Sequence, residues 1–174
     1  MSRIEDGGRG SIAKEGASLS SSTCMFCRII SGDERSFTVY HGDSVTAFLD
    51  KYPASPGHLL VVPNAHYTDY LEASDDVLCD LAAMTRVAGK AEKKALSADG
   101  VRVISNVGRS AGQMIFHLHI HIIPTWEGEV PFSWFTHRSE QPESEYREIA
   151  ASLSASIREI LAYEAEERRR ADHG

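Results

Sequence analysis

Residues 116–124 read Phe-His-Leu-His-Ile-His-Ile-Ile-Pro, and the rest of the chain is organised around them. Successive side chains of a β-strand point to opposite faces, so a strand here places three imidazoles on one face and apolar side chains on the other. The apolar face is typical of a core. The histidine face is typical of a site, because histidine serves as acid, base, nucleophile or metal ligand near neutral pH. A purification tag would be terminal and unbroken, and a merely polar face would use Thr, Lys, Glu or Ser.

Length and composition limit the classes of protein to which this chain can belong. A chain of 174 residues, 42% of them hydrophobic, suggests a single domain with a real core. The net charge of −7 argues against a basic surface that binds nucleic acid, but it allows a small anionic ligand held by local donors. We see neither an apolar stretch of the ~18 residues that a membrane span needs nor a signal peptide, and three cysteines fit a reducing cytoplasm. We therefore expect a cytoplasmic protein that binds neither nucleic acid nor membranes.

The first residues differ in composition from the rest of the chain. Residues 1–22 are rich in Gly, Ser and charged side chains and contain few apolar ones. Such a segment cannot bury enough apolar surface to fold. We therefore expect a disordered N-terminal tail over 1–22 and a single folded domain, with a C-terminal helical extension, over 23–174.

The hydrophobic patterns of the folded part predict an α+β protein. Short apolar runs predict five strands, at 37–40, 45–50, 58–63, 101–106 and 116–124. Apolar residues at helical spacing predict a crossover helix from Ser74 to about Ser97 and a terminal helix from about Glu143 to Arg170. An aromatic-rich loop at 126–135 precedes the terminal helix. Because only one helix crosses over between strands, we expect an antiparallel sheet rather than a doubly wound parallel one.

A CxxC pair, Cys24 and Cys27, opens the folded part. Such a pair holds zinc or forms a redox dithiol. A thioredoxin-like dithiol follows a strand and opens a helix in a βαβ unit, whereas this pair precedes a short segment that stops at Gly32. As zinc ligands, the two cysteines supply half a site, and histidine is the natural source of the other half.

The three histidines of the organising stretch allow two arrangements. In the first they bind one metal ion, although neighbours on one strand face are ~6.5 Å apart and the outer pair ~13 Å apart. In the second, His117 joins the cysteines and a further histidine in a structural site, which leaves His119 and His121 for chemistry. A neutral imidazole attacks phosphorus readily, and a neighbouring histidine can hold the phosphoryl oxygens or donate a proton to the leaving group.

The chain resembles the histidine-triad (HIT) superfamily. Residues 117–123 resemble its motif, His-φ-His-φ-His-φ-φ, where φ is apolar. Further segments resemble the family in the same order, at 24–32, 47–50, 56–63 and 111–113. The resemblance covers about residues 23–126 and is to the Hint branch in its zinc-carrying bacterial form. It implies a HIT fold with a five-stranded antiparallel sheet, a homodimer, and hydrolysis or transfer at the α-phosphate of a purine nucleotide, typically a nucleoside phosphoramidate.

The resemblance also implies roles for individual residues. It makes His119 the nucleophile that carries the nucleotidyl group, His121 the residue that binds phosphate and assists the leaving group, and His58 the residue that orients or polarises the row. The substrate-binding positions are Asp50 for the ribose hydroxyls, Phe26 and Leu49 near the base, and Asn106, Gly112, Gln113 and Met114 near the phosphate. The ligands of a structural zinc ion correspond to Cys24, Cys27, His66 and His117.

One position departs from the family pattern. Met114 stands where many Hint relatives have Ser or Thr, whose hydroxyl helps the departing amine, and a thioether cannot donate a hydrogen bond. We therefore expect weaker phosphoramidase activity or a different preferred leaving group. The alternatives are a dinucleoside polyphosphate hydrolase of the same superfamily, a nucleotide-binding module with little catalysis and, more distantly, a redox protein built on the CxxC pair.

Overall fold

A computed structural model describes residues 23–128 and 140–172. In these ranges the elements are a short helix α2 (Met25–Ser31), strands β1 (Thr38–His41), β2 (Val45–Leu49) and β3 (Leu59–Pro63), helix α3 (Asp75–Ala95), strand β4 (Gly100–Ile104), a 3₁₀ turn η1 (Arg109–Ala111), strand β5 (Ile120–Thr125) and helix α4 (Glu143–Ala171). The tail expected at 1–22 and most of the aromatic loop expected at 126–135 lie outside the described residues.

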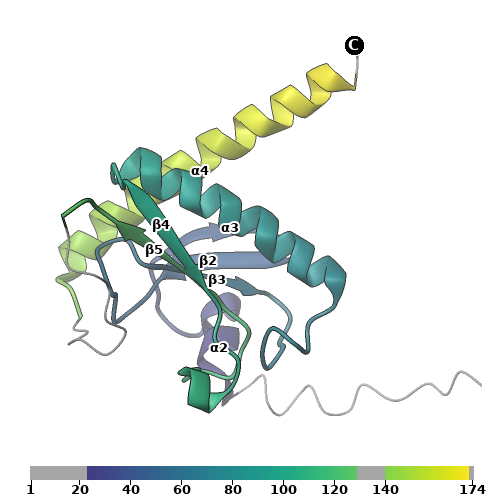
Figure 1. Cartoon of the computed structure of the whole chain (residues 1–174), viewed down its shortest axis with the longest axis vertical. Coiled ribbons are helices and arrows are strands. Elements are labelled where there is room, and N and C mark those ends of the chain that lie inside the picture. The colour runs from purple at the N-terminus through teal and green to yellow at the C-terminus, as the bar shows by residue number, and fades with distance from the viewer. Residues whose placement is uncertain (1–22, 129–139, 173–174) are drawn as a thin grey trace, which may run out of the picture.

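The five strands form one sheet in the order β1-β2-β3-β5-β4, and every neighbouring pair is antiparallel. Helix α3 makes the crossover from β3 to β4, which lies at the edge of the sheet beyond β5 (Figure 1). The predicted α+β class, with an antiparallel five-stranded sheet, one crossover helix and a C-terminal helix, is confirmed.

The sheet carries a layer of helix on each face. Side chains such as Ala47 and Val61 pack with α3 and α4 in the larger apolar cluster. Their neighbours Phe48 and Leu60 point the other way and pack with Phe26 of α2 in a smaller cluster. Strands β2 and β3 are buried on both faces, which explains why they read as continuous apolar runs rather than as alternating patterns.

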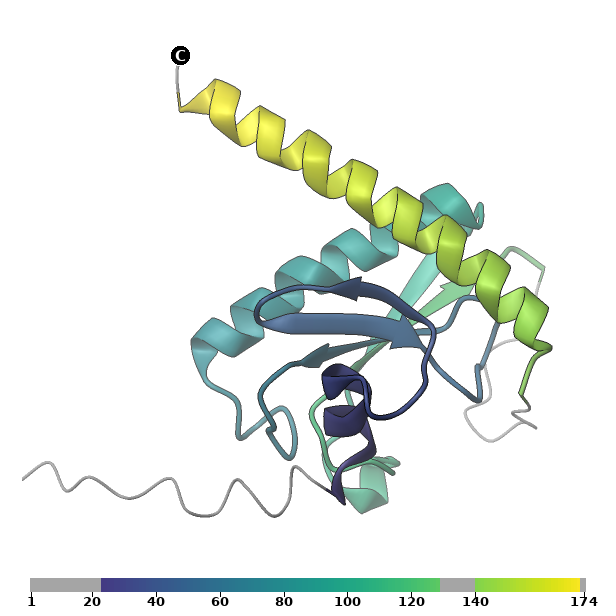
Figure 2. The same cartoon turned by 180° about the vertical axis from the view of Figure 1, so that it is seen from behind.

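Helix α4 packs along α3, and its C-terminal part extends past the sheet (Figures 1 and 2). Glu164 of α4 accepts two hydrogen bonds from the Arg86 guanidinium, at 2.6 and 2.7 Å, and one from Lys90 at 2.8 Å. These charge-assisted bonds fix the two helices to each other where apolar packing thins out. Among the described helices, none combines the length and apolar character that crossing a bilayer requires.

Two elements differ most from the sequence prediction, and the strand predicted over 101–106 ends at Ile104. A strand is predicted over 116–124, but β5 begins at Ile120, because the Leu118 N–H donates to the carbonyl of Tyr67 at 2.6 Å instead of joining the sheet. Helix α2 is not predicted, because its seven residues are too few to show a helical period. It ends at Gly32, whose φ of 84° is the left-handed conformation that glycine adopts easily.

Glu92 is a buried carboxylate on the inner side of α3. Its exposed fraction is 0%, and neither side-chain oxygen has a hydrogen-bond partner among the described residues. Burial raises the pKa of Glu92 from its ordinary value of 4.5 to about 9, because the charged form loses its hydration. The folded protein therefore keeps Glu92 protonated at neutral pH.

We expect Glu92→Gln to change how stability depends on pH. The folded state keeps the Glu92 proton up to about pH 9, whereas the unfolded chain releases it near pH 4.5, so the wild-type free energy of unfolding falls as pH rises between these values. Glutamine removes this slope. From about pH 5.5 to pH 8.5, the free energy of unfolding of the variant, measured with urea, should rise relative to that of the wild type by at least about 2 kcal/mol. Glu148→Gln, an exposed position on α4, is the control, and equal slopes in all three proteins would contradict the expectation.

Candidate active site and metal centre

Four side chains from three segments converge beside α2. They are Cys24, Cys27, His66 and His117, and their ligand atoms all lie within 4.8 Å of one another. Cys24 is the N-cap of α2 and Cys27 lies in its first turn, so the helix presents both sulfur atoms on one side. His66 comes from the loop after β3, and His117 from the segment that leads into β5. The structure thus brings together all four metal ligands that the sequence analysis names.

The hydrogen bonds of this cluster leave its imidazoles ready to bind a metal. His117 Nε2 donates to the carbonyl of Pro63 at 2.9 Å, which leaves the Nδ1 lone pair facing the sulfur atoms of Cys24 and Cys27, each 3.5 Å away. His66 Nδ1 lies 3.3 Å from the Cys27 sulfur. Burial lowers the pKa of His117 to about 4, so its ring is neutral. The donor set of two sulfur and two nitrogen atoms is compatible with zinc.

Cys27 shows why a cation fits this cluster. Burial, together with the neighbouring Cys24, raises the pKa of the Cys27 thiol to about 12. Two thiolates side by side in a partly buried site repel each other unless a positive charge lies between them. A bound divalent cation removes this repulsion and holds both sulfurs deprotonated.

His119 is held in the tautomer that a nucleophile needs. Its Nδ1 donates to the backbone carbonyl of His117 at 2.7 Å, so the lone pair is on Nε2. Burial lowers the pKa of His119, which also favours the neutral ring. The ring meets the edge of Phe26 at a centroid distance of 5.4 Å and that of His121 at 4.8 Å. His119 therefore presents an unprotonated nitrogen among apolar and imidazole neighbours.

His58 and His121 form a hydrogen-bonded pair whose direction is set by the backbone. The Ala54 N–H donates to His58 Nδ1 at 3.1 Å, so the proton of His58 is on Nε2. That N–H donates to His121 Nδ1 at 2.9 Å, which places the His121 proton on Nε2. His121 Nε2–H is thus a hydrogen-bond donor, held in this tautomer by His58.

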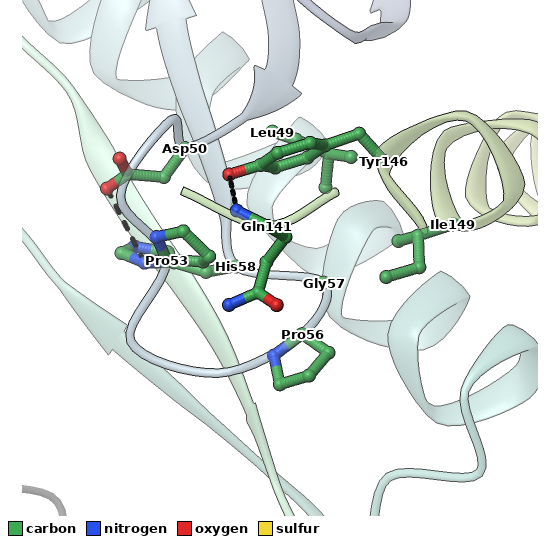
Figure 3. A pocket seen from close by; sticks show the side chains of 9 residues that line it. All are labelled: Leu49, Asp50, Pro53, Pro56, Gly57, His58, Gln141, Tyr146 and Ile149. Carbon is green, nitrogen blue, oxygen red and sulfur yellow. Dashed lines mark hydrogen bonds and ion pairs between the residues drawn. The ribbon is translucent and has the colours of Figure 1, made fainter. Parts of the chain in front are cut away.

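Asp50 lies close to both His58 and His121, and one side-chain ligand atom from each of the three residues lies within 4.8 Å of the others. One of its carboxylate oxygens is 3.5 Å from His58 Nδ1 (Figure 3). The other accepts a hydrogen bond from the Tyr52 N–H at 2.8 Å. Asp50 therefore supplies negative charge to the pair of imidazoles. The predicted contact of Asp50 with a ribose stays a prediction, as does every other substrate contact.

The two residues predicted near the base lie on opposite faces of the sheet. Phe26 packs against Phe48 and the histidine row. Leu49 points to the other face, into the larger apolar cluster, where it also lines a small pocket with Asp50 and His58. The structure therefore brings Phe26, but not the side chain of Leu49, to the side of the sheet that carries His119.

The loop between β4 and β5 carries the remaining predicted residues. Asn106 has a buried Nδ2 that lacks a hydrogen-bond partner among the described residues, which leaves a donor for a ligand. The side-chain amide of Gln113 is occupied, because it donates to the carbonyls of Thr68 and Ile115 and accepts from the Gly108 N–H. Gln113 therefore holds this loop in shape. Gly112 takes a φ of 93° where the loop turns, and Met114 is 74% exposed.

Sequence reasoning missed the backbone groups of the site. The carbonyl of His117, the carbonyl of Pro63 and the N–H of Ala54 decide which nitrogen of each ring is protonated. Since every residue carries a carbonyl and all but proline an N–H, no residue type signals such a role.

Comparison with known proteins gives a consistent family. The HIT domain model matches residues 31–128. A hypothetical histidine triad nucleotide-binding protein from Sulfolobus tokodaii strain 7 has a solved structure with 45% sequence identity and a TM-score of 0.73, covering 79% of this chain and 93% of that chain. A zinc-bound histidine triad family protein from Mycobacterium smegmatis has 28% identity and a TM-score of 0.74, covering 82% and 99%. Adenylylsulfatase HINT3 from Arabidopsis thaliana is 31% identical over 167 residues, which are 95% of this chain and 84% of the relative.

These matches agree with the geometry of the histidine row. Taken together, they support the general activity of a HIT-superfamily nucleotide hydrolase or transferase. The family model spans more than half of the chain, and the relatives match most of it. The chain therefore belongs to the HIT domain family.

Proposed function

We propose that this protein hydrolyses or transfers nucleotidyl groups at the α-phosphate of purine nucleoside phosphoramidates, through a covalent nucleotidyl-histidine intermediate. The observation that carries the proposal is the pair of complementary tautomers in the row. His119 has its lone pair on Nε2, held there by the His117 carbonyl, and His121 has its proton on Nε2, held there by His58. A nucleophile and a hydrogen-bond donor therefore lie side by side.

The reaction follows in two steps. His119 Nε2 attacks the α-phosphorus, the phosphorus–nitrogen bond of the substrate breaks, and the leaving nitrogen accepts a hydrogen bond from His121 Nε2–H while it takes a proton from a water molecule. The hydroxide that remains attacks the phosphorus, the bond to His119 breaks, and the nucleoside monophosphate forms with His119 neutral again. The Asn106 amide, with its unpartnered donor, is placed in this proposal on a phosphate oxygen, and Phe26 beside the base.

We also propose that the metal cluster binds a structural zinc ion. When bound, zinc would be held by four protein ligands, which leave no open position for substrate. The cluster joins α2 to the segment before β5, so it fixes Phe26 beside His119. The expected homodimer and the cytoplasmic location, which suits free thiols, stay predictions.

A second candidate substrate is adenylyl sulfate. Sulfate leaves as a stable anion and needs no proton, whereas an amine must be protonated to leave. Met114 is exposed and offers no hydroxyl donor, and the Arabidopsis relative is named an adenylylsulfatase. Turnover of an adenosine phosphoramidate, adenylyl sulfate and a diadenosine polyphosphate, measured side by side, separates these candidates. Micromolar nucleotide binding without turnover of any of them would favour a binding module.

His119→Ala should abolish a covalent intermediate. We expect the wild type, mixed with adenosine phosphoramidate and quenched in alkali, to show a transient gain of one adenylyl group by intact-protein mass spectrometry. His119→Ala should show none and should turn over about 10³-fold more slowly or worse. His41→Ala, an exposed histidine of β1, is the control and should keep the adduct. Unchanged product formation by His119→Ala would rule out this nucleophile.

Cys27→Ser should remove the metal. We expect about one zinc per wild-type chain by elemental analysis, and at least about tenfold less in Cys27→Ser, whose melting temperature should fall because the cluster joins separate segments. Cys79→Ser is the matched control, since Cys79 is an exposed cysteine on α3. The zinc proposal fails if wild type and Cys27→Ser hold the same amount of metal.

Met114→Thr should favour amine leaving groups. A threonine hydroxyl at this position can help the departing amine, so we expect phosphoramidate turnover to rise about tenfold while adenylyl sulfate turnover changes by less than about twofold. Met114→Val, which has the shape of threonine without the hydroxyl, should not reproduce the gain. Equal rates for Met114→Thr and the wild type would show that position 114 does not control the leaving group.

A further inference from the structure

The direction of the hydrogen bond between His58 and His121 depends on one loop. Residues 50–58 connect β2 to β3 and contain Asp50, the Ala54 N–H and His58 itself. The loop is closed by the Asp50 N–H, which donates to the His58 carbonyl at 2.9 Å, and by the His58 N–H, which donates to the Ser55 carbonyl at 3.0 Å. Whether His58 carries its proton on Nε2 therefore depends on where this loop holds the Ala54 N–H.

Two groups compete for His58 Nδ1. The Ala54 N–H lies 3.1 Å away and needs this nitrogen unprotonated, whereas the Asp50 carboxylate, 3.5 Å away, favours a proton on it. If Asp50 prevailed, His58 Nε2 would become the acceptor and His121 Nδ1 the donor of the bond between them. His121 Nε2 would then lose its proton, and with it the ability to assist a leaving amine.

The N-terminal end of helix α4 is hydrogen-bonded to this loop. The Tyr146 hydroxyl donates to the carbonyl of Lys51 at 2.7 Å and accepts from the Gln141 N–H at 3.1 Å. Figure 3 shows Tyr146 and Gln141 around the same small pocket that Asp50 and His58 line.

The tyrosine is itself rigidly placed. Its ring stacks on Phe37, with centroids 4.8 Å apart and planes at 11°, and only 7% of Tyr146 is exposed. Burial raises the pKa of Tyr146, which keeps the hydroxyl protonated and able to donate. An ion pair between Lys51 and Glu140, at 3.1 Å, lies on the exposed side of the same residue. The first turn of α4 thus fixes the start of the loop, three residues before Ala54.

We propose that Tyr146 is a positioning residue that keeps the Ala54 N–H on His58 Nδ1 and so sets the direction of the hydrogen bond between His58 and His121. Tyr146 lies beyond residues 31–128, which match the family model, so the C-terminal helix adds this control to the matched domain. The catalytic consequence rests on the proposed function, whereas the tautomer of His58 is a property of the folded protein alone.

Tyr146→Phe tests the proposal, because it keeps the stacked ring and removes only the hydroxyl and its two hydrogen bonds. We expect nitrogen-15 NMR of the imidazoles to show His58 shifting from mostly Nε2-protonated toward Nδ1-protonated. With an amine leaving group kcat should fall about tenfold while KM changes by less than about twofold, since the hydrogen bond to the leaving nitrogen is lost rather than binding. Adenylyl sulfate turnover should change by less than about twofold.

Two variants serve as controls. Tyr163→Phe removes a hydroxyl from an exposed tyrosine of the same helix, 64% exposed. Glu140→Gln removes the ion pair of Lys51 but leaves its carbonyl bonded to Tyr146. Both should keep the wild-type His58 signal and rate.

The outcomes separate this proposal from the proposed function. If Tyr146→Phe is less stable but keeps the wild-type tautomer of His58, Tyr146 is merely structural and the proposal is overturned. If the wild type turns over no nucleotide, the proposed function fails, and the NMR measurement still decides the role of Tyr146.

Discussion

The hydrogen bond from the Ala54 N–H to His58 is the interaction on which the proton positions of His58 and His121 depend, because it fixes the protons of two imidazoles in succession. Imidazole offers two nitrogens of similar basicity, and a neutral ring in water exchanges freely between its tautomers. Here His58, His117 and His119 are buried, and each has a nitrogen paired with a backbone group that accepts or donates, but not both, while His121 takes its tautomer from His58. Neighbouring histidines thereby acquire different tautomers without any difference in side chain.

The fold explains how the histidine row is held in place from both sides of the sheet. On the face that carries α2, Cys24 and Cys27 contact His117, and Phe26 packs beside His119. From the side of α4, Tyr146 holds the loop that leads to His58. Strands β2 and β3, buried on both faces, provide the rigid connection between the two supports. The site is therefore a property of the whole domain rather than of one motif.

The sequence predicts most of the fold and the side chains of the site, for identifiable physical reasons. Thiols and imidazoles are scarce and chemically demanding, so a CxxC pair and a spaced histidine row stand out, and the long apolar periods of α3 and α4 are unambiguous. The start of β5 at Ile120 could not be predicted, because it depends on a hydrogen bond to a loop residue distant in sequence. Nor could the face of Leu49 be predicted, since β2 is apolar on both sides.

His117 takes part in two structures at once. Its ring belongs to the Cys/His cluster, while its carbonyl oxygen holds the proton of His119. The Cys24 and Cys27 sulfurs each lie 3.5 Å from His117 Nδ1, and the His117 carbonyl lies 2.7 Å from His119 Nδ1. One residue therefore links the Cys/His cluster to the tautomer of His119, and a shift of the backbone at this residue alters both.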